Sequence, residues 1–264
     1  MIRSRKAMLP VARACGLLGV PRASFYRDPV EKPQVRDAEL EALSGKHPRF
    51  GYRRLAVLGG QTPKRVRLKM ERMGLTAKMP KKKVRTTYSV PVHEQNLCTL
   101  PVAPGQLLVS DFTYIALARG TAFFAVTLDA FSRRVCGYSV SRRMDTALVL
   151  EALPGRVCEG WVHHSDRGVQ YASLEFRNRI LELGGQSSFS RKARPGDNAK
   201  AESFFARFKD EVVRTDEPQT FEPLCKKIDD FVSFYNETRP HSSLGNLSPR
   251  QFEEQYKLKE MCVS

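Results

Sequence analysis

The chain has 264 residues, 41% of them hydrophobic, and carries a formal net charge of +16. A chain of this length and composition can bury a sizeable core, which excludes a disordered tail and a small disulfide-stapled domain. Its six cysteines form no CxxC pair, so we expect reduced thiols in the cytoplasm rather than a disulfide framework or a zinc site.

The basic residues are concentrated in the first 100 positions. Residues 1–100 hold 22 Lys and Arg against 7 Asp and Glu, a balance of 22 − 7 = +15, whereas residues 101–264 hold 22 against 21, a balance of +1. This split predicts a phosphate-binding front part joined to a near-neutral catalytic or structural part. No run reaches the roughly 18 apolar residues of a membrane span, so we expect no membrane partner.

The N-terminal part predicts a small helical region that binds DNA. Two short helices are expected within residues 5–27, around a turn at Gly19. This pattern fits a helix-turn-helix, and a plain helical hairpin fits it as well. After a polar linker at residues 28–36, residues 37–75 predict further helices. We therefore expect residues 1–76 to form one helical, DNA-binding region.

The last of these helices combines an apolar stripe with many bases. The stretch PKRVRLKMERMG places Val66, Met70 and Met73 at helical spacing. Its other faces carry Lys64, Arg65, Arg67, Lys69 and Arg72. Because only Glu71 opposes these five bases, we expect the helix to contact DNA phosphates rather than to present a merely solvated face.

Residues 77–105 predict a basic, extended linker. The segment contains the run PKKKVR, with Lys81, Lys82 and Lys83, and has prolines at positions 80, 91, 101 and 104. Proline disfavours helix in the residue before it, and consecutive lysines attract phosphates. We expect this linker to follow a DNA strand.

From residue 106 onward the pattern changes to strands and then to alternating helices and strands. The expected strands are LLVSDFTYIALA, TAFFAVTLDAF, VCGYSVS, WVHHS and QSSFS, and the expected helices are TALVLEALPGRV, LEFRNRILEL, AKAESFFARFKDEVVR and CKKIDDFVSFYNE. This order predicts an α/β fold with a mixed five-stranded sheet of ribonuclease-H type over residues 106–215. Residues 216–264 are expected to form a helical extension of this core.

Three acids stand at positions where such a fold would bring them together. Asp111 lies in the first strand, Asp166 follows the fourth, and Glu202 lies on the next long helix, with 202 − 166 − 1 = 35 residues between the last two. Carboxylates are preferred ligands of Mg²⁺, and a few of them can hold two divalent ions for phosphodiester chemistry. The three acids therefore predict a metal site that acts on a polyanion.

Two other acids compete for this role. Asp197 is expected to cap the helix that begins near Ala199, and Asp129 to end a strand and pair with Arg133 or Arg134. A basic rim is expected around Glu202, formed by Arg191, Lys192, Arg194, Lys200, Arg207 and Lys209. His163 is expected to be a strand residue, and His164 is a weak candidate for a contact to DNA or near the metal.

Several long blocks resemble one known family. HHSDRGVQYAS, SFSRKARPGDNAKAESFFARFKDE and YNETRPHSSLGNLSP closely resemble blocks of the orfB-type transposases of the IS-three family of bacterial insertion sequences, relatives of retroviral integrases. VSDFTYI and LDAFSRRVCGYSVS resemble that family's first two core blocks. HPRFGYRRLA with KRVRLKMERMGL resembles its upstream helix-turn-helix region.

The resemblance implies a ribonuclease-H-like core in which Asp111, Asp166 and Glu202 are the catalytic triad and hold Mg²⁺ or Mn²⁺, as two ions. It implies nicking at the ends of the element, leaving a 3′-OH that attacks another phosphodiester, through a figure-eight and then a circular intermediate. The implied partners are double-stranded DNA, as terminal inverted repeats and target DNA, a second copy of the chain, and an orfA product.

Two departures from the family accompany this resemblance. Leu108 stands where the family commonly has Trp, which is expected to alter packing rather than metal binding. The chain also begins near the orfB region, so we expect that it could act as a fusion with an upstream orfA product that carries a further helix-turn-helix and a leucine zipper.

The block YNETRPH leaves two roles open. Its residues Tyr235, Asn236, Arg239 and His241 could contact DNA or form a packing corner. Tyr235 as a nucleophile would indicate a tyrosine recombinase, but the Arg and His set which that chemistry needs is not found. The remaining alternatives to a transposase are a catalytically silent DNA-binding regulator and a nuclease of the same fold.

Overall fold

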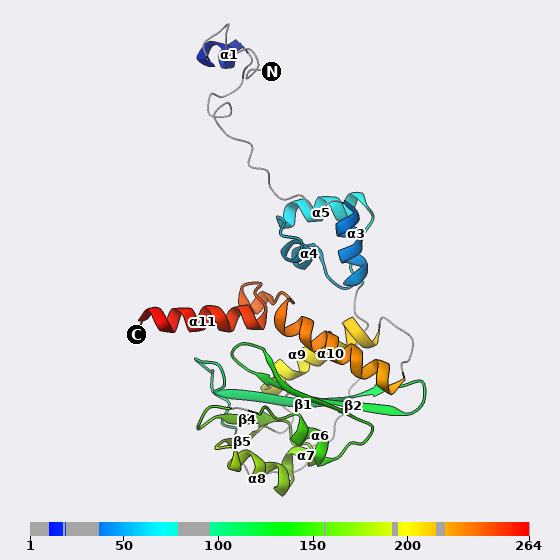
Figure 1. Cartoon of the computed structure of the whole chain (residues 1–264), viewed down its shortest axis with the longest axis vertical. Coiled ribbons are helices and arrows are strands. Elements are labelled where there is room, and N and C mark those ends of the chain that lie inside the picture. Colours follow the sequence, from blue (N-terminus) through cyan, green and yellow to red (C-terminus); the bar gives the residue numbers. More distant parts are fainter. Residues whose placement is uncertain are drawn as a thin grey trace. The chain divides into compact units, whose positions relative to one another are not determined.

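The computed structural model describes residues 11–17, 19, 37–78, 96–155, 157–191, 195–214 and 220–263 (Figure 1). The chain divides into two compact units, residues 1–36 and residues 37–264. The predicted second helix of the N-terminal hairpin, the linker at residues 28–36, and Lys81, Lys82, Lys83, Lys192 and Arg194 lie outside the described residues. The predicted domain boundaries remain predictions.

The first unit contains the expected first helix of the hairpin. This helix, α1, spans Val11–Leu17, and the glycine that follows at position 19 has φ of +62°, a left-handed conformation that suits a turn. A short helix and a glycine turn are common to a helix-turn-helix and to a plain hairpin, so both interpretations stay open.

Residues 37–78 form the three helices expected there: α3 (Asp37–Lys46), α4 (Tyr52–Leu58) and α5 (Pro63–Arg72). Leu40, Leu55, Val66 and Met70 are buried, one or two from each helix. Pro63 begins α5, where its missing N–H leaves no hydrogen bond unmade. The apolar stripe predicted for α5 is therefore confirmed, with Met73 half-buried at its end.

The sheet has the five strands that the sequence predicts, in the order β3-β2-β1-β4-β5. Their bounds are β1 (Leu107–Ala116), β2 (Thr121–Asp129), β3 (Val135–Ser141), β4 (Val162–Ser165) and β5 (Gln186–Phe189). Strands β1, β2 and β3 are antiparallel neighbours, whereas β4 pairs parallel with both β1 and β5. This mixed arrangement is the predicted ribonuclease-H-like sheet.

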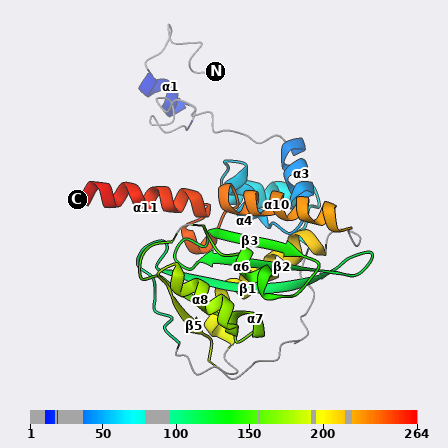
Figure 2. The same ribbon diagram turned by 60° about the horizontal axis from the view of Figure 1, so that its bottom comes forward.

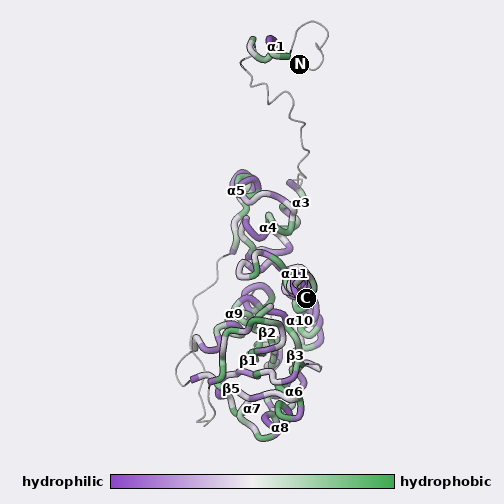
Figure 3. The backbone as a smooth tube through the Cα atoms, turned by 90° about the vertical axis from the view of Figure 1, so that its left-hand side faces the viewer, coloured by the Kyte–Doolittle hydropathy of each residue, from purple (hydrophilic) through white to green (hydrophobic). Residues whose placement is uncertain are grey.

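Helices cover both faces of the sheet (Figures 2 and 3). One face packs against α9 (Ala199–Phe208) and α10 (Phe221–Glu237), and the other against α6 (Thr146–Glu151), α7 (Val169–Ala172) and α8 (Leu174–Glu182). Apolar side chains alternate between the two cores along β1. A two-sided core explains why β2 is buried along nearly its whole length.

Several elements were not expected from the sequence. These are α7 and the 3₁₀ turns η2 (Pro195–Asn198) and η4 (Ser242–Leu244). The helix predicted through residue 214 ends as the π-helical turn η3 (Lys209–Val213), and the helical extension predicted for residues 216–264 contains the C-terminal helix α11 (Pro249–Val263). Helix α11 is anchored by Phe252, whose ring lies 5.4 Å from that of Phe131, and by Glu253, which accepts a 2.7 Å hydrogen bond from Ser132 Oγ. Helix α6 ends at Glu151, earlier than predicted.

Leu108, the departure from the family pattern, is a buried core residue. It lies in the same apolar cluster as Trp161, which is wholly buried. Leu108 also pairs with His163 across β1 and β4. The expectation that this position concerns packing therefore agrees with its burial.

Candidate active site

The sheet places Asp111 and Asp166 on neighbouring parallel strands. Strands β1 and β4 pair with an offset of 55 residues, since Leu107 lies opposite Val162 and 162 − 107 = 55. The same offset puts Asp166 opposite Asp111, since 166 − 111 = 55. Neighbouring strands lie about 4.8 Å apart, and residues in register on parallel strands point to the same face. The two carboxylates therefore meet at the carboxyl end of β4.

A tight turn fixes the Asp166 carboxylate. The backbone N–H of Gly168 donates a 3.0 Å hydrogen bond to Asp166 Oδ1. A Cβ atom at Gly168 would lie 3.0 Å from this same oxygen, which is tighter than nine in ten real Cβ contacts. Glycine at position 168 thus lets the backbone approach the carboxylate closely.

Helix α9 carries Glu202 and is held on the sheet by its apolar face. Phe204, Phe205 and Phe208 are buried, and all three rings pack around Phe124 of β2 at centroid distances from 4.9 to 6.1 Å. The side chain of Glu202 points away from this face and is exposed. The strong amphipathicity that the sequence indicates is therefore what orients this acid.

Asn198 joins the start of α9 to the strand that carries Asp111. Its Nδ2 donates a 3.0 Å hydrogen bond to the carbonyl oxygen of Ser110, and its side chain is buried. Asn198 lies four residues before Glu202, about one helical turn. The hydrogen bond therefore fixes the position of α9 relative to the residue next to Asp111.

The Asp111 carboxyl group lies in an unfavourable electrostatic environment. Burial raises its pKa well above the usual value, and the negative charges of Asp166 and Glu202 raise it further. A hydrogen bond from Phe112 N and the positive charge of Lys209 oppose this rise. Burial also raises the pKa of Asp166. Asp111 therefore lies near enough to Asp166 and Glu202 for their negative charges to act on its carboxyl group.

Tyr171 of α7 was not expected at this site. Its hydroxyl group is buried and makes no hydrogen bond with the described residues. The pKa of this hydroxyl is raised well above its usual value, by burial first and then by the charges of Asp111 and Asp166. The sequence gives no signal for this residue apart from its place in the block HHSDRGVQYAS.

The donor set suits a hard divalent cation. Carboxylate oxygens are the ligands that Mg²⁺ and Mn²⁺ prefer, and a cation would relieve the mutual repulsion of Asp111 and Asp166. Among the residues that the structure describes, however, no three acidic, histidine or cysteine side chains lie close enough to hold a metal ion as they stand. Because Glu202 is exposed, its side chain has room to turn toward the two aspartates.

The two competing acids have structural roles of another kind. The Asp129 carboxylate accepts hydrogen bonds from the backbone N–H groups of Gly105, Phe131 and Ser132 rather than pairing with the side chain of Arg133 or Arg134. Its backbone is hydrogen-bonded to the backbones of both arginines. Arg134 instead forms a 2.9 Å ion pair with Glu253 of α11. Asp129 therefore holds two loops at the end of β2.

The predicted cap by Asp197 is also wrong. The N-cap of α9 is Asn198, which makes no side-chain capping bond, and Asp197 lies one residue earlier in η2. Its carboxylate forms a 2.9 Å ion pair with Arg191 and accepts a 3.0 Å hydrogen bond from Asn96. These partners lower the pKa of Asp197, with the Arg191 hydrogen bond as the largest cause.

The buried histidines take no part in the acidic site. His163 Nε2 lies 2.8 Å from Ser110 Oγ, and the two ring nitrogens of His164 lie 2.8 and 3.1 Å from Ser188 Oγ and Ser190 Oγ. Burial lowers the pKa of His163 to about 3 and that of His164 to about 4. Because serines occupy both its nitrogens, His164 is not available to DNA or a metal, which corrects that prediction.

The basic side chains of α5 are paired with one more acidic side chain than the sequence predicted. Lys69 lies 2.9 Å from Asp37 of α3, which also pairs with Arg72. Arg67 lies 3.7 Å from Glu71 one turn away. Two acids rather than one therefore oppose the five bases. Lys64 and Arg65 are exposed and form no ion pair among the described residues.

Where the structure describes them, the basic side chains predicted to surround Glu202 are half-buried or paired with an acid. Arg191 is exposed but paired with Asp197, and Lys200 and Arg207 are half-buried on α9. Lys209, at the start of η3, lies 5.1 Å from the ring centroid of Tyr114 on β1 and senses the charge of Asp111. Of these bases, Lys209 is the one whose charge reaches the Asp111 carboxylate.

The block YNETRPH forms a packing corner. Asn236 exchanges two hydrogen bonds with the backbone of Val135, at 2.9 and 3.0 Å, and Tyr235 is buried. Arg239 is wholly buried and forms a two-pronged ion pair with Glu211, at 2.6 and 3.2 Å. The prediction that Arg239 contacts DNA is therefore corrected, and a buried Tyr235 is not placed to act as a nucleophile.

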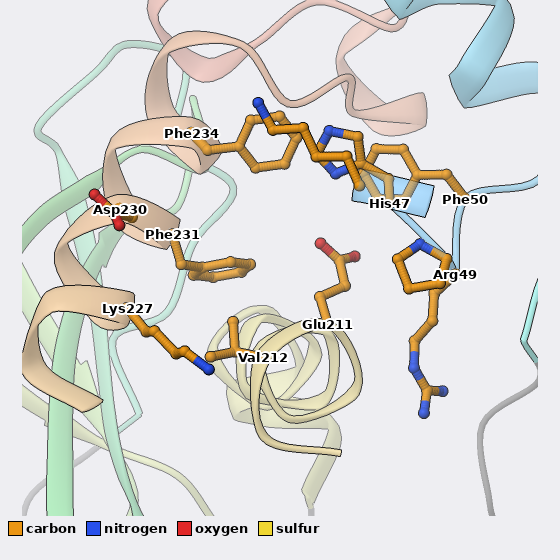
Figure 4. A pocket seen from close by; sticks show the side chains of 11 residues that line it. His47, Arg49, Phe50, Glu211, Val212, Lys227, Asp230, Phe231 and Phe234 are labelled. Carbon is orange, nitrogen blue, oxygen red and sulfur yellow. The ribbon is translucent and has the colours of Figure 1, made fainter. Parts of the chain in front are cut away.

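A cavity of about 250 Å³ lies apart from the three acids (Figure 4). Its walls come from the loop after α3, from η3 and from α10, and include His47, Phe50, Glu211 and Phe234. The His47 ring stacks between Phe50 and Phe234, at 4.9 and 4.7 Å. None of the three acids lines this cavity.

Comparisons with known proteins identify similar sequences over nearly the whole chain. A family model described as an integrase core domain matches residues 101–195, and a second with the same description matches residues 183–249. The chain is 32% identical to the transposase for insertion sequence element IS904 of Lactococcus lactis, over 84% of this chain and 98% of that protein. It is 31% identical to a 31 kDa protein of insertion element IS600 from Shigella sonnei, over 92% of this chain and 98% of that protein.

A solved structure of similar fold is the HTLV-2 integrase catalytic core domain in complex with magnesium. It covers 58% of this chain and 98% of its own, with 14% identity and a TM-score of 0.44. Within the described residues, no helix is long and apolar enough to cross a membrane.

Proposed function

Because the chain belongs to the insertion-sequence transposases with an integrase core domain, we propose that Asp111, Asp166 and Glu202 are its catalytic residues. The chain is a DNA transposase, a polynucleotidyl transferase that cleaves and joins DNA strands. The observation that carries the assignment is the register of β1 and β4, which brings Asp111 and Asp166 side by side beneath the helix of Glu202.

The three carboxylates would hold Mg²⁺ or Mn²⁺, as two ions, with Asp111 between the other two acids. When bound, such ions polarise the scissile phosphodiester and lower the pKa of the attacking hydroxyl. Asp111 and Asp166 would present their oxygens on the same side of the sheet, and Glu202 would turn inward from α9 to complete the set. Lys209 adds a positive charge beside Asp111, where the phosphate would lie.

The DNA contacts proposed outside the metal site fall on the basic part of the chain. They are Lys64, Arg65, Arg67 and Lys69 of α5, Lys81, Lys82 and Lys83 of the linker, and Arg191, Lys192, Lys200 and Arg207 near Glu202. The exposure of Lys64 and Arg65 supports their part in this set. Backbone contacts of this kind position DNA without reading its sequence.

The proposed partners follow from the reaction. Two element ends must be joined to one target, so we infer that the chain acts as a homo-oligomer on double-stranded DNA, at terminal inverted repeats and target sites. An orfA product is proposed as a further partner. A silent regulator is disfavoured because all three acids are present and share one electrostatic environment.

The function is tested with labelled duplexes that end in either a 3′-OH or a 3′-deoxy nucleotide. We expect the purified chain with Mn²⁺ to produce longer, joined strands from the 3′-OH duplex and none from the 3′-deoxy duplex, with no protein bound covalently to DNA. Cleavage without joining would instead identify a nuclease. Joining from the 3′-deoxy end, or a covalent protein–DNA product, would contradict the proposal.

Asn198 provides a test of how α9 is positioned. Replacing Asn198 by Ala removes the hydrogen bond to the Ser110 carbonyl oxygen, whose net value is about 0.5–1.5 kcal/mol. We expect joining to slow up to about tenfold while the affinity for DNA stays unchanged. Single-turnover joining rates and fluorescence anisotropy measure the two quantities. The matched control is Asn178→Ala on α8, and an equal loss of rate there would exclude a specific role for Asn198.

A further inference from the structure

Four arginines from distant parts of the chain gather on one side of α9. Arg54 comes from α4, Arg133 from the turn between β2 and β3, Arg207 from α9 and Arg239 from the end of α10. The guanidinium carbons of Arg54 and Arg239 lie 5.2 and 5.4 Å from the ring centroid of Phe50. Arg207 and Arg133 are close enough to Arg239 and Tyr235 for their charges to interact.

The cluster contains far more positive than negative charge. Glu211 is the acid of this cluster, and its carboxylate is taken by the two-pronged ion pair with Arg239. Arg207 donates hydrogen bonds to Ser203, whereas the guanidinium groups of Arg54 and Arg133 form no hydrogen bond or ion pair with the described residues. Half-buried arginines without a carboxylate are unusual, because their desolvation is not compensated.

A second observation indicates that the cluster accommodates a ligand. His241 is buried, its ring packs 4.6 Å from that of Tyr235, and its Nε2 has no hydrogen-bond partner among the described residues. Burial lowers the pKa of His241 to about 3, and the charges of Arg239 and Arg207 act in the same direction. The Nε2 atom of His241 is thus a buried polar atom without a partner, beside a cluster of guanidinium groups that lacks negative charge.

The geometry of α9 relates this cluster to the catalytic acids. With 100° per residue, Lys200, Ser203 and Arg207 share one flank of the helix, and Glu202, Ala206 and Lys209 share the opposite flank. The observed contacts agree, since Lys200 and Arg207 interact with Arg133, whereas Lys209 interacts with Asp111. The two groups are therefore separated by about one helix diameter, roughly 10 Å.

We propose that Arg54, Arg133 and Arg207 bind a backbone phosphate of the DNA on the flank of α9 opposite Glu202. This inference rests on the proposed function, because it assumes that a DNA strand crosses α9 to reach the acids. The ion pair of Arg239 with Glu211 lies beneath the proposed phosphate site and keeps its side chains in place. Through Arg54, helix α4 would contact the same DNA strand. The phosphodiester supplies the negative charge that the chain itself lacks there.

The test compares two double variants of equal net charge. Arg54→Gln with Arg133→Gln removes the site, and Arg119→Gln with Arg143→Gln removes two exposed arginines at the ends of strands. Anisotropy of a fluorescein-labelled duplex of mixed sequence is measured in EDTA over a range of salt concentrations. We expect the site variant to bind about tenfold more weakly, and the slope of log K against log salt to fall by about 0.9. The control should keep the wild-type slope.

A second measurement does not involve DNA. Inorganic phosphate should raise the melting temperature of the wild type and the control, but not that of the site variant, because it occupies the arginine cluster. Equal slopes and affinities for the two variants, with normal joining by the wild type, would overturn this inference alone. A site variant that unfolds without DNA would also overturn it. Absence of any duplex binding by the wild type would overturn the proposed function as well.

Discussion

Asp111→Asn, Asp166→Asn and Glu202→Gln should each stop DNA cleavage and joining, while binding of duplex DNA should persist. Each change removes one anionic ligand from a site where bound metal supplies several kcal/mol of transition-state stabilisation, so the rate should fall by at least roughly a thousandfold. The variants keep the size and hydrogen-bonding shape of the side chains. Gel assays of labelled strands measure the rate, and anisotropy measures binding.

Glu182→Gln serves as the matched control for this series. Glu182 is an exposed helical acid that pairs with Arg179 at 3.0 Å, and neutralising it changes the net charge by the same amount. We expect its joining rate to equal that of the wild type. Joining by any purified single variant of the three acids at more than a few per cent of the wild-type rate would contradict their catalytic assignment.

Glu211→Gln should cause the largest loss of stability expected from a single conservative change. It leaves Arg239 wholly buried without a carboxylate, beside Arg54 and Arg207. Breaking a buried ion pair in this way costs about 3–5 kcal/mol of the free energy of unfolding. Arg239→Met should cost less, because Glu211 retains two arginines as neighbours. Urea unfolding at fixed pH measures both.

The exposed pair of Arg250 with Glu237 provides the comparison. These side chains lie 2.6 Å apart but are largely accessible to water. Exposed pairs contribute about 0–1 kcal/mol, so Glu237→Gln should change the free energy of unfolding by less than that. A similar small change for Glu211→Gln would show that the buried pair is not a structural anchor. A larger loss for Arg239→Met than for Glu211→Gln would contradict the charge balance described for the cluster.

The elements that the sequence predicted correctly depend on local patterns. Alternating or continuous apolar runs identified all five strands, and the spacing of Phe204, Phe205 and Phe208 identified α9. The two aspartates could be placed together because they fall at equivalent positions of neighbouring strands. Short elements such as α7, with four residues, have no pattern long enough to be detected.

Several of the incorrect predictions share one physical cause, which is a partner far away in the sequence. Arg239 was a candidate for DNA contact, but it is buried and paired with Glu211, which lies 28 residues earlier. Asp37 neutralises Lys69 from 32 positions away. Ser188 and Ser190 occupy His164 in the same way. The hydrogen bond from Asn198 to the Ser110 carbonyl oxygen also joins residues 88 positions apart, so the spacing of residues could not predict it.

The most direct test of the metal site is thermal unfolding of the wild type and of Asp111→Asn, with and without Mn²⁺ at neutral pH. A carboxyl group whose folded pKa is raised weakens the fold progressively as pH rises from its unfolded pKa to its folded pKa, since the unfolded chain ionises more easily. Without metal, Asp111→Asn should therefore melt at a higher temperature than the wild type.

Mn²⁺ at roughly a hundred times its Kd should add about 2.7 kcal/mol to the free energy of unfolding of the wild type, which raises the melting temperature. The Asp111→Asn variant should respond little, and Asp197→Asn, which changes an acid outside the site, should respond like the wild type. An Asp111→Asn variant that is stabilised by Mn²⁺ as much as the wild type would contradict the carboxylate metal site.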